Sequence, residues 1–272
     1  MSRIAECFSR LKQGKRKALV VFVTAGDPTR LVTVPLMHAM VAAGADIIEL
    51  GVPFSDPEAE GPVIQAACER ALADATSLSD VIAMVADFRK EDGRTPVILM
   101  GYLNPIEVMG YAKFSEAAGT AGVDGIITVN LPPEEADSLS GALRGSGVDC
   151  VYLLAPTTTL KRARKICAAS SGFVYYVSLK GVTGAATLDV ESVARKLESF
   201  YSVSDLPIAV GFGIKDGPSA AAVARLADGV VVGSSLVEIV AGHRDQPDII
   251  PDKVSRLVKS MRVAIDAAGQ ST

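Results

Sequence analysis

The sequence predicts an α/β fold: a single (β/α)8 barrel, or TIM barrel, that spans residues 1–272 and carries an N-terminal capping helix. Eight short apolar runs recur along the chain, and amphipathic segments of helical period separate them. No linker rich in proline, serine or glycine divides the chain. An open, doubly wound sheet has the same local pattern, but the count of eight favours the closed barrel.

The first 17 residues contain the predicted capping helix. Ile4, Cys7, Phe8 and Leu11 recur there at helical spacing among charged residues, whereas a signal peptide has a continuous apolar run. No later run approaches the roughly 18 apolar residues that a membrane span needs. We therefore expect a cytoplasmic protein that contacts no membrane.

The apolar runs are the predicted strands, and their continuous apolar character is typical of strands buried on both faces. They cover residues 18–27, 46–53, 96–105, 124–133, 149–158, 172–181, 206–215 and 227–235. The predicted helices between them include residues 31–44, 78–93, 133–147 and 193–200. A last helix over roughly 249–268 ends the fold.

Composition argues against two kinds of partner. The chain has 27 Lys and Arg against 31 Asp and Glu, a net charge of -4, which leaves no large basic surface for nucleic acid. Its 4 cysteines are scattered without a CxxC pair, and it has only 2 histidines. We expect neither a disulfide framework nor a metal site.

The first candidate for chemistry is a glutamate inside the second predicted strand. Catalytic groups of barrels lie where strands end, and Glu49 interrupts the apolar run IIELGV. Strand alternation places Glu49 on the same face as Ile47 and Gly51. If that face is the barrel interior, burial raises the pKa of the carboxyl, as a proton-transfer group near neutral pH requires. A structural ion pair with a lysine or arginine is the alternative.

The next loop, VPFSDPEAEGP at 52–62, adds Asp56, Glu58 and Glu60 among prolines and a glycine. Such a composition suits a long surface loop that shapes a pocket. Acidic loops are also often merely solvated, so this loop alone assigns no function.

Glycines follow the seventh and eighth predicted strands, in Gly211-Phe212-Gly213 and in Gly233-Ser234-Ser235. Glycine lets backbone N–H groups approach a phosphate, and a helix that starts at Ser234 or Ser235 supplies further N–H groups. Turn chemistry alone also explains single glycines, but two glycine-rich ends at these strands favour a small phosphorylated substrate. A third such stretch, KGVTGAA at 180–186, has the composition of a lid that excludes water, or of a plain surface loop.

Four segments resemble the signature segments of the tryptophan synthase alpha subunit family: ELGVPFSDP (49–57), GPVIQ (61–65), KGVTG (180–184) and GFGI (211–214). The resemblance runs in the same order from FVTAGDP near residue 22 to GSSLVEIV near 240. It implies a TIM-barrel lyase that cleaves indole-3-glycerol phosphate by a retro-aldol reaction to indole and glyceraldehyde-3-phosphate. It also implies that no metal or organic cofactor takes part.

The resemblance implies roles for individual residues. Glu49 matches the glutamate that protonates indole C3 and accepts the proton of the glycerol 3′-hydroxyl, and Glu60 matches the carboxylate that stabilises charge at the indole nitrogen. The implied substrate contacts are Phe22, Met100, Tyr102, Ile127, Tyr175, Thr183 and Phe212. The implied phosphate contacts are Gly184, Gly213, Gly233 and Ser234.

Two residues depart from the family pattern. Glu60 stands where an aspartate is usual, and Asn130 stands where an aspartate usually precedes the LPPEE-like segment. Glu60 keeps the charge but adds a methylene, and a displacement of roughly 1 Å in a catalytic group can cost on the order of 100-fold in rate.

The resemblance further implies a partner, the pyridoxal-phosphate beta subunit, in an α2β2 heterotetramer through which indole passes directly. The implied contact residues are Asp56, Pro57 and Asn104. Three alternatives stay open: another sugar-phosphate reaction on the same barrel, a non-catalytic subunit that binds indole and phosphate, and a lyase that works alone and releases indole. Phe22, Tyr175 and Phe212, which would form an apolar aromatic pocket, favour an indole substrate.

Overall fold

The computed structural model describes residues 2–178, 190–211 and 213–269. Within them, nine strand segments form one parallel sheet in the order β5-β4-β3-β2-β1-β9-β8-β7-β6. The segments are β1 (Ala18–Thr24), β2 (Ile47–Gly51), β3 (Val97–Gly101), β4 (Gly125–Thr128), β5 (Asp149–Cys150), β6 (Leu153–Leu154), β7 (Val174–Val177), β8 (Ile208–Gly211) and β9 (Gly229–Val232).

The sheet closes through the fifth predicted strand, which the structure divides into β5 and β6. β5 pairs with β4, and β6 pairs with β7. Between them, the Val151 amide donates to the Ile126 carbonyl (2.9 Å), and the Tyr175 amide donates to the Tyr152 carbonyl (3.1 Å). One chain segment therefore joins both halves of the sheet, and the predicted eight-stranded barrel is confirmed.

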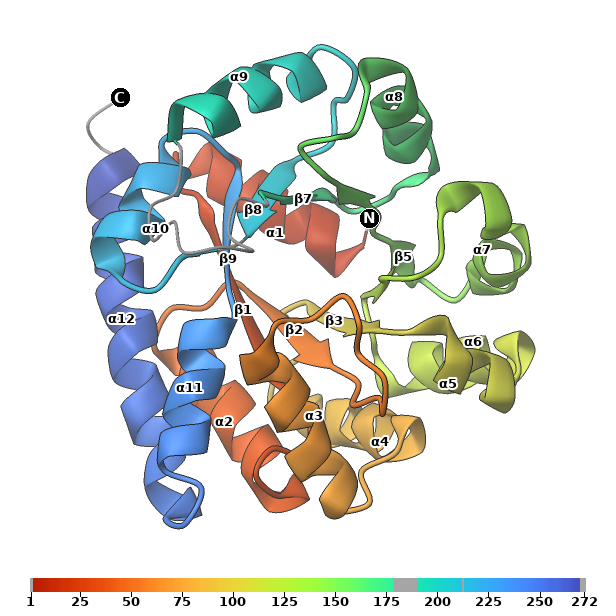
Figure 1. Ribbon diagram of the computed structural model, residues 1–272, viewed down its shortest axis with the longest axis vertical. Helices are drawn as coiled ribbons and strands as arrows, with labels where there is room; N and C mark the ends of the chain where they lie inside the picture. Colours follow the sequence, from red (N-terminus) through yellow and green to blue (C-terminus); the bar gives the residue numbers. More distant parts are fainter. Residues whose placement is uncertain (1, 179–189, 212, 270–272) are drawn as a thin grey trace.

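Helices surround the strands (Figure 1). They are α1 (Arg3–Gln13), α2 (Arg30–Ala42), α3 (Pro62–Ala73), α4 (Leu78–Phe88), α5 (Leu103–Met109), α6 (Tyr111–Ala121), α7 (Asp137–Leu143), α8 (Leu160–Ala169), α9 (Val190–Tyr201), α10 (Gly217–Ala224), α11 (Ser234–Gly242) and α12 (Ile250–Gly269), with two 3-10 turns, η1 (Pro133–Glu135) and η2 (Pro247–Ile249). The predicted helix over 133–147 is only partly present, as η1 and α7. It ends early because Gly145 adopts a left-handed φ of 93°, which a helix cannot contain.

The helix α1 closes one end of the barrel, as predicted. Its buried side chains pack against interior residues of the strands, including Val20, Ile47 and Ile98. The four buried residues of this helix are Ile4, Cys7, Phe8 and Leu11. Arg3 adds an ion pair to the buried Asp124 at the start of β4 (2.8 Å). The opposite end, where the strands finish, is the one available for a site.

Two further properties follow from the described ranges. None of the helices there is both long and apolar enough to cross a bilayer. Nor do those ranges bring three or more His, Cys, Asp or Glu side chains together in a way that could hold a metal ion.

Candidate active site

Glu49 points into the barrel. In the register of the sheet it lies between Phe22 of β1 and Ile98 of β3. Its neighbours Ile48 and Leu50 belong to the outer core between strands and helices, so the alternation predicted from sequence is confirmed. The carboxylate stands on an inner wall of the barrel, near the end where the strands finish.

The Glu49 side chain is buried without compensation. The residue is 1 % exposed, and neither carboxylate oxygen has a hydrogen-bond partner within the described ranges. The structural ion pair considered as an alternative is absent from the ion pairs of those ranges. Burial, and then the charge of Glu60, raises the pKa of Glu49 to about 8.

Glu60 lies in the loop between β2 and α3 and faces the same space. Burial raises the pKa of its carboxyl to about 7. Its charge acts on Glu49 and also on Tyr175, whose pKa is raised well above its usual value by burial, by Glu49 and by Glu60. The structure therefore brings Glu49, Glu60 and Tyr175 together from three separate parts of the chain.

The loop that carries Glu60 is held from two sides. On one side, the Tyr102 hydroxyl accepts a hydrogen bond from the Ala59 amide (2.8 Å), and the Tyr102 ring stacks on Phe54 with centroids 5.0 Å apart. On the other, the Gln65 side-chain amide donates to the Glu60 carbonyl (2.9 Å). Gln65 belongs to the segment GPVIQ, but the sequence alone gave it no predicted role. The available signal was its place in the first turn of a helix, from which a glutamine reaches back over the preceding loop.

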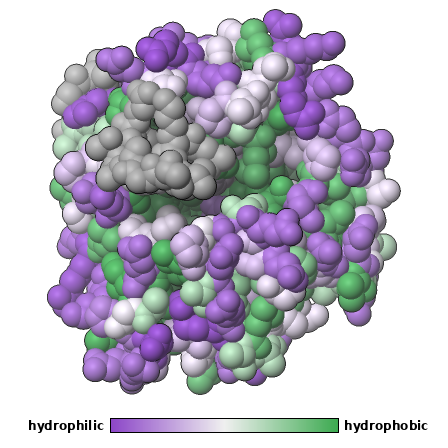
Figure 2. Space-filling view, in the orientation of Figure 1, coloured by the Kyte–Doolittle hydropathy of each residue, from purple (hydrophilic) through white to green (hydrophobic). Residues whose placement is uncertain are grey.

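An apolar wall adjoins the carboxylates. Phe22 packs with Ala67 of α3 and Val237 of α11, and Met100 joins this cluster. Val63 and Ile64 of α3, which were not among the predicted site residues, also join it. The space-filling view shows a hollow near the centre of this face, where apolar surface is exposed (Figure 2).

Ile127 and Tyr175 lie deeper in the barrel, with the cluster beneath α1. The hydroxyl of Tyr175 fills the place that a Cβ at residue 211 would occupy, so Gly211 has to lack one. At residue 51, a Cβ would lie 2.7 Å from the Phe22 ring. Both glycines keep room for aromatic side chains inside the barrel.

The structure places two of the four implied phosphate contacts, Gly233 and Ser234, at one helix N-terminus. Helix α11 begins at Ser234, as predicted, with Gly233 as its N-cap. Gly213 has a φ of 69°, in the left-handed region that favours glycine. The Cβ position of Gly233 is 3.5 Å from Phe22, so the start of α11 adjoins the apolar wall. Thr183, Gly184 and Phe212 lie outside the described residues, as does the predicted lid.

A barrel mouth with paired carboxylates, an apolar wall and a helix N-terminus agrees with the resemblance seen in the sequence. A family model described as "Tryptophan synthase alpha chain" matches residues 8–266. The chain belongs to this family. It is a lyase of tryptophan biosynthesis that cleaves indole-3-glycerol phosphate. Two alternatives, another sugar-phosphate reaction and a non-catalytic subunit, are therefore set aside.

Relatives in the family match over nearly their whole length. The tryptophan synthase alpha chain of Thioalkalivibrio sulfidiphilus is 62% identical over 266 residues, covering 98% of this chain and 100% of the relative. That of Nitrosococcus oceani is 59% identical over 267 residues, 98% of each. Among solved structures, the alpha subunit from Legionella pneumophila str. Paris superposes with a TM-score of 0.92 at 46% identity, covering 98% of this chain and 99% of that one.

Three residues carried over from the family as partner contacts lie near the mouth. Asp56 and Asn104 are exposed and Pro57 is half-buried. Asn130, one of the two departures from the family pattern, ties the end of β4 to the start of α5. It accepts from the Leu103 amide (2.8 Å) and donates to the Asn104 side chain (3.3 Å).

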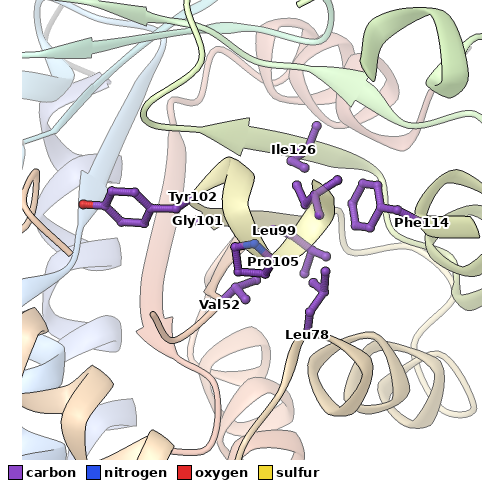
Figure 3. Close-up of a pocket in the computed structure, with 9 residues that line it drawn as sticks. Val52, Leu78, Leu99, Gly101, Tyr102, Pro105, Phe114 and Ile126 are labelled. Atoms are coloured by element: carbon purple, nitrogen blue, oxygen red, sulfur yellow. The ribbon is translucent and has the colours of Figure 1, made fainter. Parts of the chain in front are cut away.

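A small apolar cavity lies beside this region, between β3 and α5, and is distinct from the mouth. Figure 3 shows Leu78, Leu99 and Phe114 around it, with the Tyr102 ring directed away from them. Its volume of about 10 Å³ is far below the roughly 300 Å³ of a small-molecule site. It is therefore too small to hold an indole phosphate.

Proposed function

We propose that Glu49 and Glu60 are the two carboxyl groups that carry out the retro-aldol cleavage in this family member. The observation that carries the proposal is the Glu49 carboxyl, buried and unpartnered within the described ranges, in a mouth that it shares with Glu60. Burying a carboxyl without a partner costs free energy, and groups whose pKa is shifted by such burial cluster at functional sites. Two carboxyls whose surroundings differ can take separate roles in acid–base chemistry.

The proposed reaction has two proton transfers. The protonated Glu49 donates its proton to indole C3, and the carboxylate of Glu60 stabilises the positive charge that develops at the indole nitrogen. Glu49, now ionised, accepts the proton of the 3′-hydroxyl. The bond between indole C3 and the glycerol carbon then breaks, its electron pair returns to the indole ring, and the alkoxide carbon becomes the aldehyde. Glu49 is again protonated at the end, so protons balance.

The pH dependence of kcat/KM should be bell-shaped. Ionised Glu60 is required, so the rate rises through its pKa of about 7, and protonated Glu49 is required, so the rate falls through its pKa of about 8. The maximum is expected between these values in assays from pH 5.5 to 9.5. A rate that still increases above about pH 9 would contradict the assignment of Glu49 as the acid.

Glu60 should act through its charge. We expect Glu60→Gln to lower kcat by about 100-fold, and Glu60→Asp to lower kcat or leave it nearly unchanged, because this loop is fitted to glutamate. Steady-state cleavage by the wild type, Glu60→Gln and Glu60→Asp at one pH measures both changes in kcat. Equal rates for glutamate and glutamine would remove Glu60 from the mechanism, and a large gain with aspartate would mean that the loop is not fitted to glutamate.

We further propose where the substrate lies. The indole would pack against Phe22, Met100, Ile127 and Tyr175. Tyr102, which holds the loop that carries Glu60, would lie close by. The phosphate would bind at Gly213, Gly233 and Ser234, where free N–H groups and the dipole of α11 favour an anion. Thr183, Gly184 and Phe212 are carried over from the family to the same substrate.

We also propose a partner, the pyridoxal-phosphate beta subunit, in an α2β2 heterotetramer of the cytoplasm that receives indole directly. The support comes from a solved structure of tryptophan synthase from M. tuberculosis in its aminoacrylate-bound form, which superposes with a TM-score of 0.86 at 31% identity over 97% of this chain. Asp56, Asn104 and Val108, which is 89% exposed on α5, supply accessible polar and apolar surface beside the mouth.

The partner proposal predicts that Val108→Asp weakens the complex. A charge placed in a docking surface loses apolar burial and is left without a partner, which typically costs about 2 kcal/mol or more. Sedimentation and cleavage rate with added beta subunit measure binding. Val263→Asp, at an apolar site on α12 that is 63% exposed, is the matched control. If the wild-type chain formed no complex with the beta subunit and its cleavage rate did not change, a lyase that works alone would be favoured.

A further inference from the structure

The backbone around Glu60 forms a tight turn, and the side chain of Gln65 is hydrogen-bonded to it. The Glu60 amide donates to the Pro57 carbonyl (3.0 Å), which closes a four-residue turn. The Gln65 amide nitrogen donates to the Glu60 carbonyl (2.9 Å) and also lies 3.4 Å from the Pro57 carbonyl. One side chain therefore contacts both ends of the turn that presents Glu60.

Only a donor fits this position. Both partners of the Gln65 amide are carbonyl oxygens, so a carboxylate would face two acceptors, and a methionine would remove the side-chain donor from the Glu60 carbonyl. The glutamine itself is half-buried, and its own backbone amide donates to the Gly61 carbonyl (3.0 Å). Its contribution is therefore a directed hydrogen bond from a helix to a loop.

The helix that carries Gln65 is firmly attached to the barrel. Arg70 of α3 forms a two-point ion pair with the buried Asp27, which follows β1, at 2.7 and 2.8 Å. Such paired contacts fix geometry as well as adding stability. On the far side of the loop, the Ala59 amide is bonded to Tyr102. Glu60 thus sits between a contact from α3 and a contact from the end of β3.

We propose that Gln65 is a positioning residue, which holds the turn of residues 57–60 so that the longer side chain of Glu60 reaches the correct depth in the mouth. This inference rests on the proposed role of Glu60. An error of roughly 1 Å in a catalytic group can cost on the order of 100-fold, and Tyr102 still holds the loop when Gln65 is changed. The loss on changing Gln65 is therefore partial.

The test uses Gln65→Met, which keeps the length and apolar stem of the side chain but removes its donor. We expect kcat to fall about tenfold, because Glu60 is no longer held in position, and KM to stay within about twofold, because the substrate contacts remain. A loosened turn also exposes Glu60 to water, which lowers its pKa from about 7 and moves the acid limb of the pH profile to lower pH. Gln246→Met, the same change ahead of η2, should alter neither quantity.

A double-mutant cycle separates positioning from general damage. If Gln65 acts through Glu60, Gln65→Met should slow the Glu60→Gln protein by less than about twofold. An equal loss in both backgrounds, or an acid limb that does not move, would overturn the proposal while leaving Glu60 in the mechanism. An unchanged kcat for Gln65→Met would overturn it too. Full activity of Glu60→Gln alone would instead mean that the proposed function of Glu60 is wrong, and the role of Gln65 with it.

Discussion

Replacing Glu49 with glutamine is expected to abolish cleavage and, at the same time, to make the folded protein more stable. Glutamine has the same shape but neither donates a proton to indole C3 nor accepts one from the hydroxyl. The loss in kcat should be at least about 100-fold and can reach about 10,000-fold. Binding of a substrate analogue should change little, because the apolar wall and the proposed phosphate site at the start of α11 are untouched.

The gain in stability follows from proton binding. The Glu49 carboxyl titrates near 4.5 in an exposed setting and at about 8 in the folded protein. Between these values the folded state holds a proton that the unfolded state releases, so the free energy of unfolding falls as pH rises. The contribution of Glu49 is fully present below pH 4.5 and is lost as pH rises through about 8. Glutamine does not titrate and avoids this loss.

The expected gain for Glu49→Gln is on the order of 3 kcal/mol at pH 7 and below about 1 kcal/mol at pH 5. For a chain of this size that corresponds to a rise in Tm of roughly 5 to 10 °C at pH 7. Thermal unfolding at both pH values, with an indole-release assay, measures the two effects. Glu58→Gln, which changes an exposed glutamate in the loop after β2, is the control. A variant that keeps more than about a tenth of the wild-type rate would exclude Glu49 as the acid–base group.

Replacing Asp124 with alanine is expected to have the opposite pair of effects, a large loss of stability with kcat almost unchanged. Asp124 is 2% exposed, and its carboxylate receives Arg3 of α1, Arg89 after α4 and the backbone amide of Val97 (2.8 Å). Arg89 is itself only 10% exposed. Removing the carboxylate leaves a buried cation without its partner, which typically costs about 3 to 5 kcal/mol.

That cost should lower Tm by about 10 °C. The kcat should stay within about twofold, because Asp124 precedes β4 at the end of the barrel opposite the mouth. Asp252→Ala, which removes an exposed ion pair with Arg256 in α12, should change the free energy of unfolding by no more than about 0.5 kcal/mol. If Asp124→Ala melted like the wild type, the ion pairs at the base of α1 would not contribute to stability.

Local sequence patterns predicted the closed barrel, but neither the ends of its strands nor the division of its fifth strand. The apolar runs were longer than the strands, because apolar residues such as Val52 and Pro53 continue into the loops. The interruption between β5 and β6 was not predictable, because it depends on which neighbour each residue pairs with. Alternation predicted that Glu49 lies on one face of its strand and that Ile48 and Leu50 lie on the other. Only the closed sheet determines which of these faces is interior.

The candidate site was predicted in its residue types more than in its geometry. Glu60 was found by resemblance, but its depth in the mouth depends on contacts with distant residues. The Tyr102 hydroxyl accepts a hydrogen bond from the Ala59 amide, 43 positions away in the sequence, and no local pattern predicts this hydrogen bond. The exposure of a carboxyl in a loop likewise depends on packing from other elements, which is why burial of Glu60 could not be inferred from its acidic neighbours.

The division of the fifth strand bears on how the barrel could fail. Residues 149–154 are the sole chain segment by which β4 and β7 are joined in the strand order of the described sheet. If this short segment detached, two strand edges would lose their partners in a single event. Both would offer unsatisfied amides and carbonyls flanked by apolar side chains, the arrangement that templates aggregation. Resistance of the whole barrel to edge-to-edge association therefore depends on six residues far from the carboxylates at the mouth.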